Sequence, residues 1–322
     1  MRRDTFLKTL AAMAAGAGSA AWPLSALAAA NLKMMIPANP GGGWDSTGRA
    51  LGKALQDSGA ATAITYENKG GAAGALGLAQ FINGAKGDPH ALIMMGQVMI
   101  GGIITTKSPI SITQCTPVAR LTSEYTAFVL PAQSPLKTMK DVVEQMKKDP
   151  GSVKWGGGSR GSTEHITIAM IARETGVDPT KINYVPFRGG GEAVAAILGN
   201  NVTVGASGYS EFQQYIESGK MRAIAMASPA REKGINVPTL KEMGINVELG
   251  NWRGVYGAAG ISAAERAALT EMVVKATKTK SWIEALDKNN WTPALMTGKA
   301  FDEFVDREFA SLRATMFKAG MA

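Results

Sequence analysis

Two glycine-rich segments carry the clearest chemical signal in this chain of 322 residues. Residues 40–45 read Pro-Gly-Gly-Gly-Trp-Asp, and residues 156–162 read Gly-Gly-Gly-Ser-Arg-Gly-Ser. Each segment lies between a short apolar run and an amphipathic pattern, so each is predicted to open a helix. A helix N-terminus offers unpaired N–H groups and a partial positive charge, and glycines let a ligand approach the backbone closely. The two segments therefore predict two anion cradles, one in each of two domains.

The second glycine-rich segment also matches a dinucleotide-binding fingerprint. Residues 156–161 have the GxGxxG spacing between a predicted strand and a predicted helix. A Rossmann unit needs an acidic residue about 20 positions later, at the end of its second strand. The nearest acidic residues, Glu174 and Asp178, come before the next predicted strand at 182–186. An exported dinucleotide-dependent oxidoreductase is therefore one alternative, but the chain lacks the acidic residue that a Rossmann unit needs at the end of its second strand.

The same segment spells the nucleophile elbow of serine hydrolases. Residues 157–161 read GxSxG, with Ser159 in the place of the nucleophile. Such an enzyme needs a histidine as general base, and the chain contains two. His165 follows the serine closely on the same helix opening, and His90 precedes it against the usual chain order. A serine hydrolase is the second alternative and ranks below the oxidoreductase.

Residues for a metal ion or a bound cofactor are not suitably spaced. The first glycine-rich segment matches a P-loop only in part, since Arg49 and Ala50 replace the lysine and the Mg²⁺-binding hydroxyl. The two histidines and the single cysteine, Cys115, lie too far apart for a zinc or haem motif. The net charge of +8 is spread along the chain, which indicates mild attraction of acidic ligands rather than nucleic acid binding. We expect no cofactor, no metal, no nucleic acid partner and a buried Cys115.

The N-terminus predicts export by a signal peptide at 1–30. Residues 2–8 are basic, residues 9–21 are rich in alanine, glycine, methionine and leucine, and Ala-Leu-Ala at 26–28 is a small-x-small cleavage site. The arginine pair resembles a twin-arginine signal, and the general secretory route is the alternative. Nothing later in the chain has the run of about 18 apolar residues that spans a membrane. We expect a protein of the periplasm.

Short apolar runs alternate with helical patterns along the rest of the chain, which predicts α/β lobes with mostly parallel sheets. Strands are predicted at 32–36, 63–67, 91–95, 153–155, 182–186, 202–206 and 221–226. Residues 118–121 and 126–130 read as an extended crossover between the lobes. A capping box at 262–265 opens a late helix, and the apolar spacing over 301–316 predicts a closing one.

Five segments in this order resemble the periplasmic solute-binding proteins of tripartite tricarboxylate transporters, also called the Bug family. The segments are 37–45, 156–165, 185–193, 207–212, and 238–242 followed by 251–254. Each segment alone is unspecific, whereas the ordered set is specific. The resemblance covers nearly the whole mature length.

This resemblance implies a type II periplasmic binding fold, with two α/β lobes joined by a hinge and a ligand cleft between them. It implies a first lobe made from both chain ends, 31–128 and 228–322, and a second lobe at 129–227. We expect a monomer without enzymatic activity that delivers a small carboxylated ligand to a two-component membrane permease. Closure about a hinge near 126–130 and 222–226 is expected to capture the ligand.

The resemblance also points to the residues that hold the ligand carboxylates, partly through ordered water. They are Asn39, Gly41, Gly42, Gly43, Trp44 and Asp45 in the first lobe, and Ser159, Gly161, Ser162, His165, Gly190 and Tyr209 in the second. The presence of Trp44 together with Asn-Trp-Arg-Gly at 251–254 favours citrate or another di- or tricarboxylate.

Several of these residues have structural alternatives that the sequence leaves open. Asp45 binds the ligand, or it caps its helix and orients the loop. His165 contacts the ligand in its neutral form, or it bonds to the loop backbone. Tyr209 lines the cleft or packs beneath it. Three arginines are either charge partners of the ligand or solvated surface: Arg160, Arg188 and Arg253.

Overall fold

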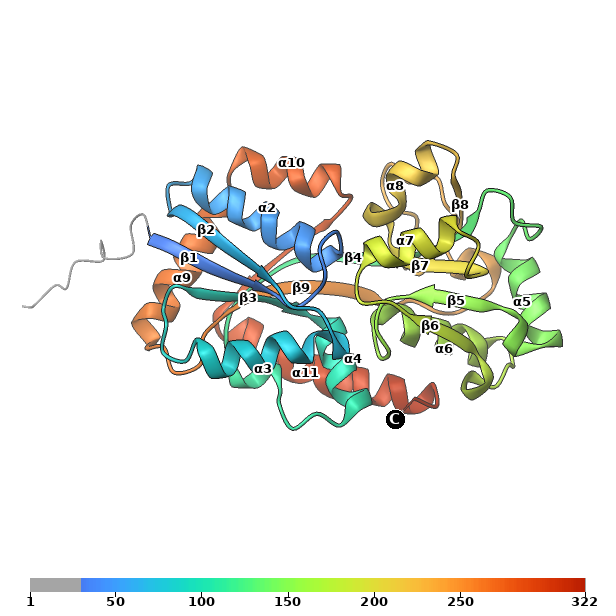
Figure 1. Ribbon diagram of the computed structural model, residues 1–322, viewed down its shortest axis with the longest axis horizontal. Helices are drawn as coiled ribbons and strands as arrows, with labels where there is room; N and C mark the ends of the chain where they lie inside the picture. Colours follow the sequence, from blue (N-terminus) through green and yellow to red (C-terminus); the bar gives the residue numbers. More distant parts are fainter. Residues whose placement is uncertain (1–29, 322) are drawn as a thin grey trace, which may run out of the picture.

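The computed structural model describes residues 30–321, so the predicted signal peptide lies outside the described residues except for its last position. Figure 1 shows two α/β lobes arranged along the long axis of the molecule. Ten strands of the described chain join in the order β2-β1-β3-β9-β4-β7-β5-β6, and β8 and β10 pair with β4 outside this path. The expectation of two α/β lobes is confirmed.

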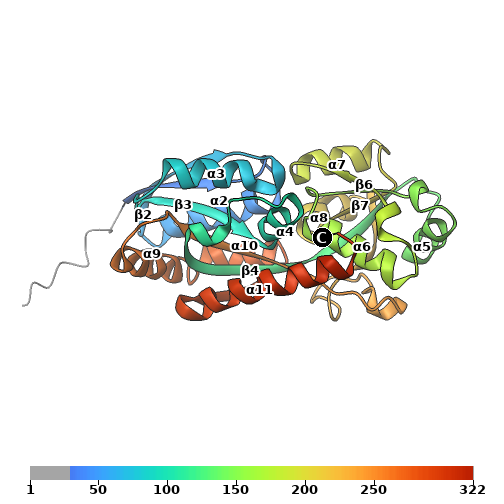
Figure 2. The ribbon, with the colours of Figure 1, turned by 90° about the horizontal axis from the view of Figure 1, so that it is seen from below.

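The first lobe is formed by the N-terminal elements and by the last part of the chain. Its elements are β1 (Ala30–Ile36), α2 (Gly43–Asp57), β2 (Ala61–Asn68), α3 (Ala75–Gly84), β3 (Ala91–Gly96), α4 (Gln97–Thr106), β9 (Gly250–Gly257), α9 (Ala263–Ala276), α10 (Lys280–Lys288), β10 (Thr292–Thr297) and α11 (Gly298–Lys318). The predicted capping box is present at α9, where the Ser262 and Glu265 side chains each bond to the other's backbone N–H. In Figure 2, α11 runs beneath β4.

The second lobe contains the middle of the chain. Its elements are α5 (Met139–Lys148), β5 (Lys154–Gly157), α6 (Thr163–Glu174), β6 (Asn183–Pro186), α7 (Gly190–Leu198), β7 (Val204–Gly208), α8 (Tyr209–Glu217) and β8 (Met221–Met226). The second glycine-rich segment leads from β5 into α6, as the sequence predicts. A further glycine turn leads from β6 into α7.

The sheets are parallel only at their outer strands. β1 pairs in parallel with β2 and β3, and β5 pairs in parallel with β6 and β7. All pairings of β4 (Thr116–Pro131) and β9 are antiparallel. The expectation of mostly parallel sheets is therefore wrong for the centre, because strands from later in the chain return there without a crossover helix.

One long strand, β4, takes part in both lobes. The sequence predicts an extended crossover between the lobes over 118–121 and 126–130, and the structure has a single strand of 16 residues there. Its first part, as far as Tyr125, pairs with β9, and from Thr126 onward it pairs with β7 and β8. The strand thus passes from one lobe to the other between Tyr125 and Thr126.

The segment between β8 and β9 packs on the second lobe. Leu240, Ile245 and Val247 are buried in the same apolar cluster as Phe128 and Trp155. The backbone N–H of Leu249 donates to the carbonyl of Ala227 at 3.2 Å, just before β9 begins. The sequence places this segment in the first lobe, whereas its apolar side chains complete the core of the second.

The two lobes touch at their apolar cores. Leu51 and Leu55 of α2 face the first-lobe core, as their spacing predicts. The same cluster includes Ile166 of α6, which belongs to the second lobe and is fully buried. Ile166 lies beside Gly101 of α4. The N-terminus of α6 is therefore held against the first lobe.

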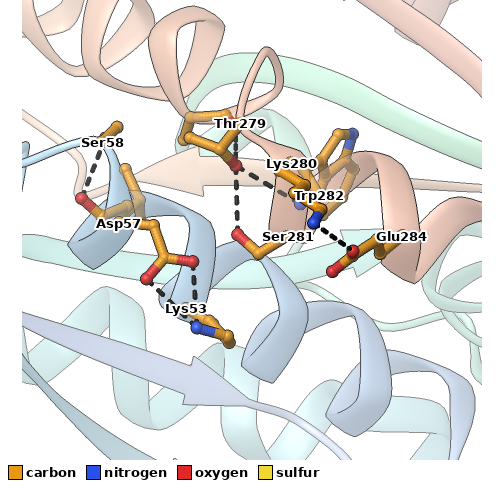
Figure 3. Close-up of polar contacts among 10 residues, drawn as sticks. Lys53, Asp57, Ser58, Thr279, Lys280, Ser281, Trp282 and Glu284 are labelled. Atoms are coloured by element: carbon orange, nitrogen blue, oxygen red, sulfur yellow. Dashed lines mark hydrogen bonds and ion pairs between the residues drawn. The ribbon is translucent and has the colours of Figure 1, made fainter.

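The far end of α2 is fixed by α10. Figure 3 shows where the two helices meet, and the Ser281 side chain of α10 hydrogen-bonds to Asp57 of α2. Within α2, Lys53 pairs with Asp57 at 3.0 Å, and the Thr279 hydroxyl caps α10. The hydroxyl accepts from the N–H of Trp282 at 3.3 Å, and the Trp282 ring is buried in the first-lobe core. Because α2 is anchored here, its N-terminal glycine loop has a fixed support.

Candidate functional site

A cavity of about 90 Å³ lies where the N-termini of α2, α6 and α7 converge. The first lobe lines it with Gly42, Gly43, Trp44, residues of the 71–74 turn, Val98, Asn251 and Arg253. The second lobe lines it with Gly158, Ser159, Ser162, Glu164, Phe187, Arg188, Gly190, Ser207 and Glu211. Three helix N-termini around one cavity form a setting in which backbone N–H groups favour an anion.

The first glycine loop is braced by an ionised carboxylate. Gly41 has φ +85°, and its N–H donates to Asp45 Oδ2 at 3.1 Å. Asp45 Oδ1 accepts from Arg49 Nε at 2.9 Å and from Asn68 Nδ2 at 3.0 Å. Burial by itself raises the pKa of Asp45, but the hydrogen bonds from Arg49, Asn68 and Gly41 outweigh it and hold the pKa below its ordinary value. Asp45 orients the loop and does not line the cavity.

A buried ion pair lies directly beneath the first loop. Arg253 of β9 pairs with Glu124 of β4, and their side chains are only 3% and 4% exposed. Arg253 Nη1 also donates to Thr47 Oγ1 at 3.3 Å, and the guanidinium lies over the ring of Trp291. Burial lowers the pKa of Arg253 to about 9, so the group stays charged at neutral pH. A Cβ at Gly43 would collide with this guanidinium, which explains the glycine.

The second glycine loop satisfies its own backbone. The N–H of Gly161 donates to His165 Nδ1 at 3.1 Å, and the N–H of Ser162 donates to the carbonyl of Ser159 at 2.9 Å. Ser162 is the N-cap of α6, and its hydroxyl accepts from the N–H of His165 at 3.4 Å. The Tyr184 hydroxyl donates to the carbonyl of Gly158 at 2.6 Å. The loop is held in shape by the residues around it.

His165 acts as a neutral brace in this arrangement. Its ring stacks on Tyr184 with centroids 4.1 Å apart. Burial lowers its pKa to about 4, and the charge of Arg160 acts in the same direction. The structure thus favours the backbone-bonding alternative for His165. His90, the other histidine, lies in the first lobe beside Asp88, so neither histidine is hydrogen-bonded to Ser159 as a general base would be.

The predicted site residues fall into two groups. Six of the twelve line the cavity: Gly42, Gly43, Trp44, Ser159, Ser162 and Gly190. The other six lie outside its lining: Asn39, Gly41, Asp45, Gly161, His165 and Tyr209. Tyr209 packs against the second-lobe core, which is the structural alternative for this residue. Of the three arginines, Arg188 and Arg253 reach the cavity, and Arg160 is exposed.

The first loop meets the glycine turn before α7 across the two lobes. Asn39 Nδ2 donates to Glu192 Oε1 at 2.7 Å, and the N–H of Asn39 lies 3.5 Å from the carbonyl of Arg188. A Cβ at Gly42 would lie 3.4 Å from the backbone nitrogen of Gly190. A second contact joins Asn290 Nδ2 to Gln213 Oε1 at 3.0 Å. The lobes are in contact around the cavity.

Two acidic residues at the cavity were not predicted. Glu164 is 6% exposed, and its Oε2 atom has no hydrogen-bond partner in the described chain. Burial raises the pKa of Glu164, although the Ser162 hydroxyl bonds to it. Burial also raises the pKa of Glu211 to about 7, and the charge of Glu164 adds to this, against hydrogen bonds from Ser207 and the N–H of Gly43. An acid in the first turn of a helix is usually a solvated complement to the dipole, so the sequence gives no signal of their burial.

Two α/β lobes around a cavity of helix N-termini define a two-lobed solute-binding protein with the type II periplasmic fold, as expected. The chain belongs to the tripartite tricarboxylate transporter receptor family, because the family model "Tripartite tricarboxylate transporter family receptor" matches residues 49–320.

Similar proteins support this membership. The protein BugT of Bordetella pertussis is 27% identical over 305 residues, covering 92% of each chain. The structure of the periplasmic binding protein BugD matches with a TM-score of 0.81 and 21% identity, over 90% of this chain and 98% of BugD. MatC from Rhodopseudomonas palustris, solved with bound malate, matches with a TM-score of 0.77 and 21% identity, over 88% and 98%. Between residues 30 and 321, no helix is both long and apolar enough to cross a bilayer.

Proposed function

We propose that this protein is a periplasmic solute-binding protein that captures a small carboxylated molecule in the cavity between its lobes. The observation that carries the proposal is the convergence of the N-termini of α2, α6 and α7 on one cavity that also holds Arg253. The partial positive charge of these helix N-termini favours a carboxylate. Family membership and the malate held by MatC support the same ligand class.

The ligand is captured by closure of the two lobes. Contacts across the cavity, such as Asn39 to Glu192, form only when the lobes are together, so a ligand that touches both lobes favours the closed form. We place the hinge where β4 passes between Tyr125 and Thr126 and where β9 begins at Gly250. The lobes then comprise 30–125 with 250–321, and 126–249.

The loaded protein then delivers its ligand to a two-component membrane permease, acting as a monomer. Citrate or another di- or tricarboxylate is the ligand that the sequence favours. Export through the twin-arginine or the general secretory route places the protein in the periplasm. The family model, which describes a transporter receptor, supports this role.

A thermal-shift titration tests the proposal. Citrate, malate, succinate and adipate are titrated into the protein, with inorganic phosphate as the control anion. A carboxylate that binds the folded state raises the melting temperature increasingly as its concentration exceeds Kd. Stabilisation by phosphate but by no carboxylate would refute the proposal.

A charge variant locates the binding. Ser159 lines the cavity and is half-buried, so Ser159→Glu places a negative charge beside the ligand. We expect the ligand-induced shift to be lost, since like charges at close range weaken binding by about tenfold or more. Ser152→Glu makes the same change at an exposed position of the same lobe and should keep the shift. Equal shifts in both variants would place the ligand elsewhere.

A further inference from the structure

Two carboxyl groups at the cavity lack a positive partner. Glu164 of α6 and Glu211 of α8 both line the cavity from the second lobe. No lysine or arginine of the described chain forms an ion pair with either residue. Glu164 is more than nine-tenths buried, and its Oε2 atom has no hydrogen-bond partner within residues 30–321. An unpaired buried carboxylate is costly, so such a group either takes up a proton or gains a cationic partner.

The buried cation of the cavity is already paired. Arg253 is neutralised by Glu124 from the neighbouring strand. Arg188 also lines the cavity, but its side chain is exposed to solvent at the rim. The two glutamates are therefore left without a buried cation of their own. A ligand that carries only carboxylates would bring further negative charge against Glu164 and Glu211.

One amide that the sequence assigns to the ligand already has a protein carboxylate beside it. The N–H of Gly43, at the start of α2, hydrogen-bonds to Glu211. A Cβ at Gly190 would collide with Glu211 Oε2, so this carboxylate also lies against the N-terminus of α7. The acidic side chain of Glu211 thus projects into the region between the helix N-termini.

The cavity wall also contains aromatic rings. Trp44 of the first lobe and Phe187 of the second both line it. The face of an aromatic ring attracts a cation through its quadrupole. Acidic and aromatic side chains together are the surroundings that a protonated amine prefers.

We propose that the ligand is a zwitterion, a small carboxylic acid that also carries a protonated amine, and that Glu164 and Glu211 bind the amine. The inference rests on the proposed function and narrows its ligand class. The carboxylate of the ligand is held by helix N–H groups, and the amine supplies the positive charge that the two glutamates lack. Citrate has no amine and is expected to bind weakly.

Matched pairs of acids test the inference directly. The members of each pair differ by one amino group: succinate and aspartate, glutarate and glutamate, butyrate and 4-aminobutyrate. Binding is measured by isothermal titration calorimetry on the full mature protein. We expect the amino member of at least one pair to bind about tenfold tighter or more, as for a charge-assisted bond to a buried carboxylate. An acid that binds as tightly as its amino partner in every pair overturns the inference.

Two variants test the assigned residues. Glu164→Gln and Glu211→Gln keep the shape of the side chain and remove its charge, so each should reduce the preference for the amino member. Glu174→Gln makes the same change at an exposed position at the far end of α6 and should keep the preference. The two variants are read separately, so a folding defect in one leaves the other as a test. An unchanged preference in a folded variant removes that residue from the site.

The number of protons released or taken up on binding distinguishes two ways in which a glutamate could meet the ligand. A bound amine favours the ionised glutamate, whereas a bound carboxylate favours the protonated one. The charged groups around Glu211 are Glu164 from α6, Arg253 from β9, Glu124 from β4 and Arg188 before α7. With its pKa near 7, Glu211 is partly protonated in the empty cavity, and a bound amine would expel that proton. Calorimetry in two buffers of different ionisation enthalpy should show proton release, and proton uptake would overturn the inference. If none of these acids binds but citrate, malate or adipate does, the inference fails and the proposed function stands; if no carboxylate of either set binds, the proposed function itself fails.

Discussion

The two glycine loops have similar sequences but are held in different ways. The first loop, 40–45, is braced by the ionised Asp45 and lies over the buried pair of Arg253 and Glu124. The second loop, 156–162, is braced by the neutral His165 stacked on Tyr184. The first loop meets the opposite lobe through a hydrogen bond of the preceding Asn39, whereas the second satisfies its backbone locally and meets the opposite lobe by close packing of Gly161 on Gly101 of α4. Glycine content alone therefore predicts the shape of a loop but not the chemistry that supports it.

The largest effect is expected beneath the first loop. Arg253→Met leaves Glu124 buried without its partner, and we expect the free energy of unfolding to fall by about 3–5 kcal/mol. The double variant Arg253→Met with Glu124→Leu removes both charges and should recover most of this loss. Urea denaturation at neutral pH measures both. A single variant as stable as the parent would show that the pair does not support the loop.

A smaller effect is expected at the second loop. His165→Phe keeps a ring on Tyr184 but leaves the N–H of Gly161 without its acceptor, which should cost about 1–2 kcal/mol of unfolding free energy. His165→Ala also loses the stacking and should cost about 1 kcal/mol more. Equal losses in the two variants would show that the stacking contributes nothing.

The two loops should also differ in their response to pH. The pKa of His165 is about 4 in the folded protein, against an ordinary value of 6.5, so only the unfolded chain takes up this proton between those values. Stability therefore falls as the pH is lowered from 6.5 toward 4, and His165→Phe should lack this part of the fall. The pKa of Asp45 is lowered from 3.8, so its contribution is present above 3.8 and is lost only at still lower pH. Unfolding curves of the parent, His165→Phe and Asp45→Asn across this pH range check that the His165 contribution is lost at higher pH than the Asp45 contribution. A loss of stability just below pH 6.5 that persists in His165→Phe would contradict this expectation.

The smallest effect is expected where the first loop meets the second lobe. Asn39→Ala removes the hydrogen bond to Glu192 at the surface, so the free energy of unfolding should change by less than about 0.5 kcal/mol. Ligand affinity should fall about threefold, because this bond is made only when the lobes are closed. Asn201→Ala, at an exposed site of the second lobe, is the control. Calorimetry with the acid that gives the largest thermal shift measures the difference.

Much of the fold could be predicted from the periodicity of the sequence. The spacing of Leu51, Ala54 and Leu55 predicts α2, and short apolar runs predict the strands that flank both glycine loops. By contrast, α4 is not predicted, because its sequence is apolar or small almost throughout and it is buried on several sides. The crossover between the lobes at β4 is predicted, but its pairing with strands of both sheets is not, since no local pattern shows those partners.

The site could be predicted only in part, because its composition depends on how the lobes meet. Residues of the two glycine loops are near the cavity, as the motifs indicate. Glu164 and Glu211 lie within segments that the sequence singles out, but each is an ordinary first-turn acid when its helix is considered alone. The burial of Glu164 and the partial burial of Glu211 result from packing between elements far apart in the chain, which no local sequence pattern indicates.

The burial of the Ile166 side chain stabilises the closed arrangement of the two lobes. This residue belongs to the second lobe but is fully buried in the apolar cluster of the first. Separation of the lobes would expose the Ile166 side chain to water, at a cost of about 1.5–3 kcal/mol. Part of the free energy of closure thus comes from the protein itself and not from the ligand. Such a bias lowers the free energy that every ligand must supply for closure, so it raises the affinity for all of them by the same factor.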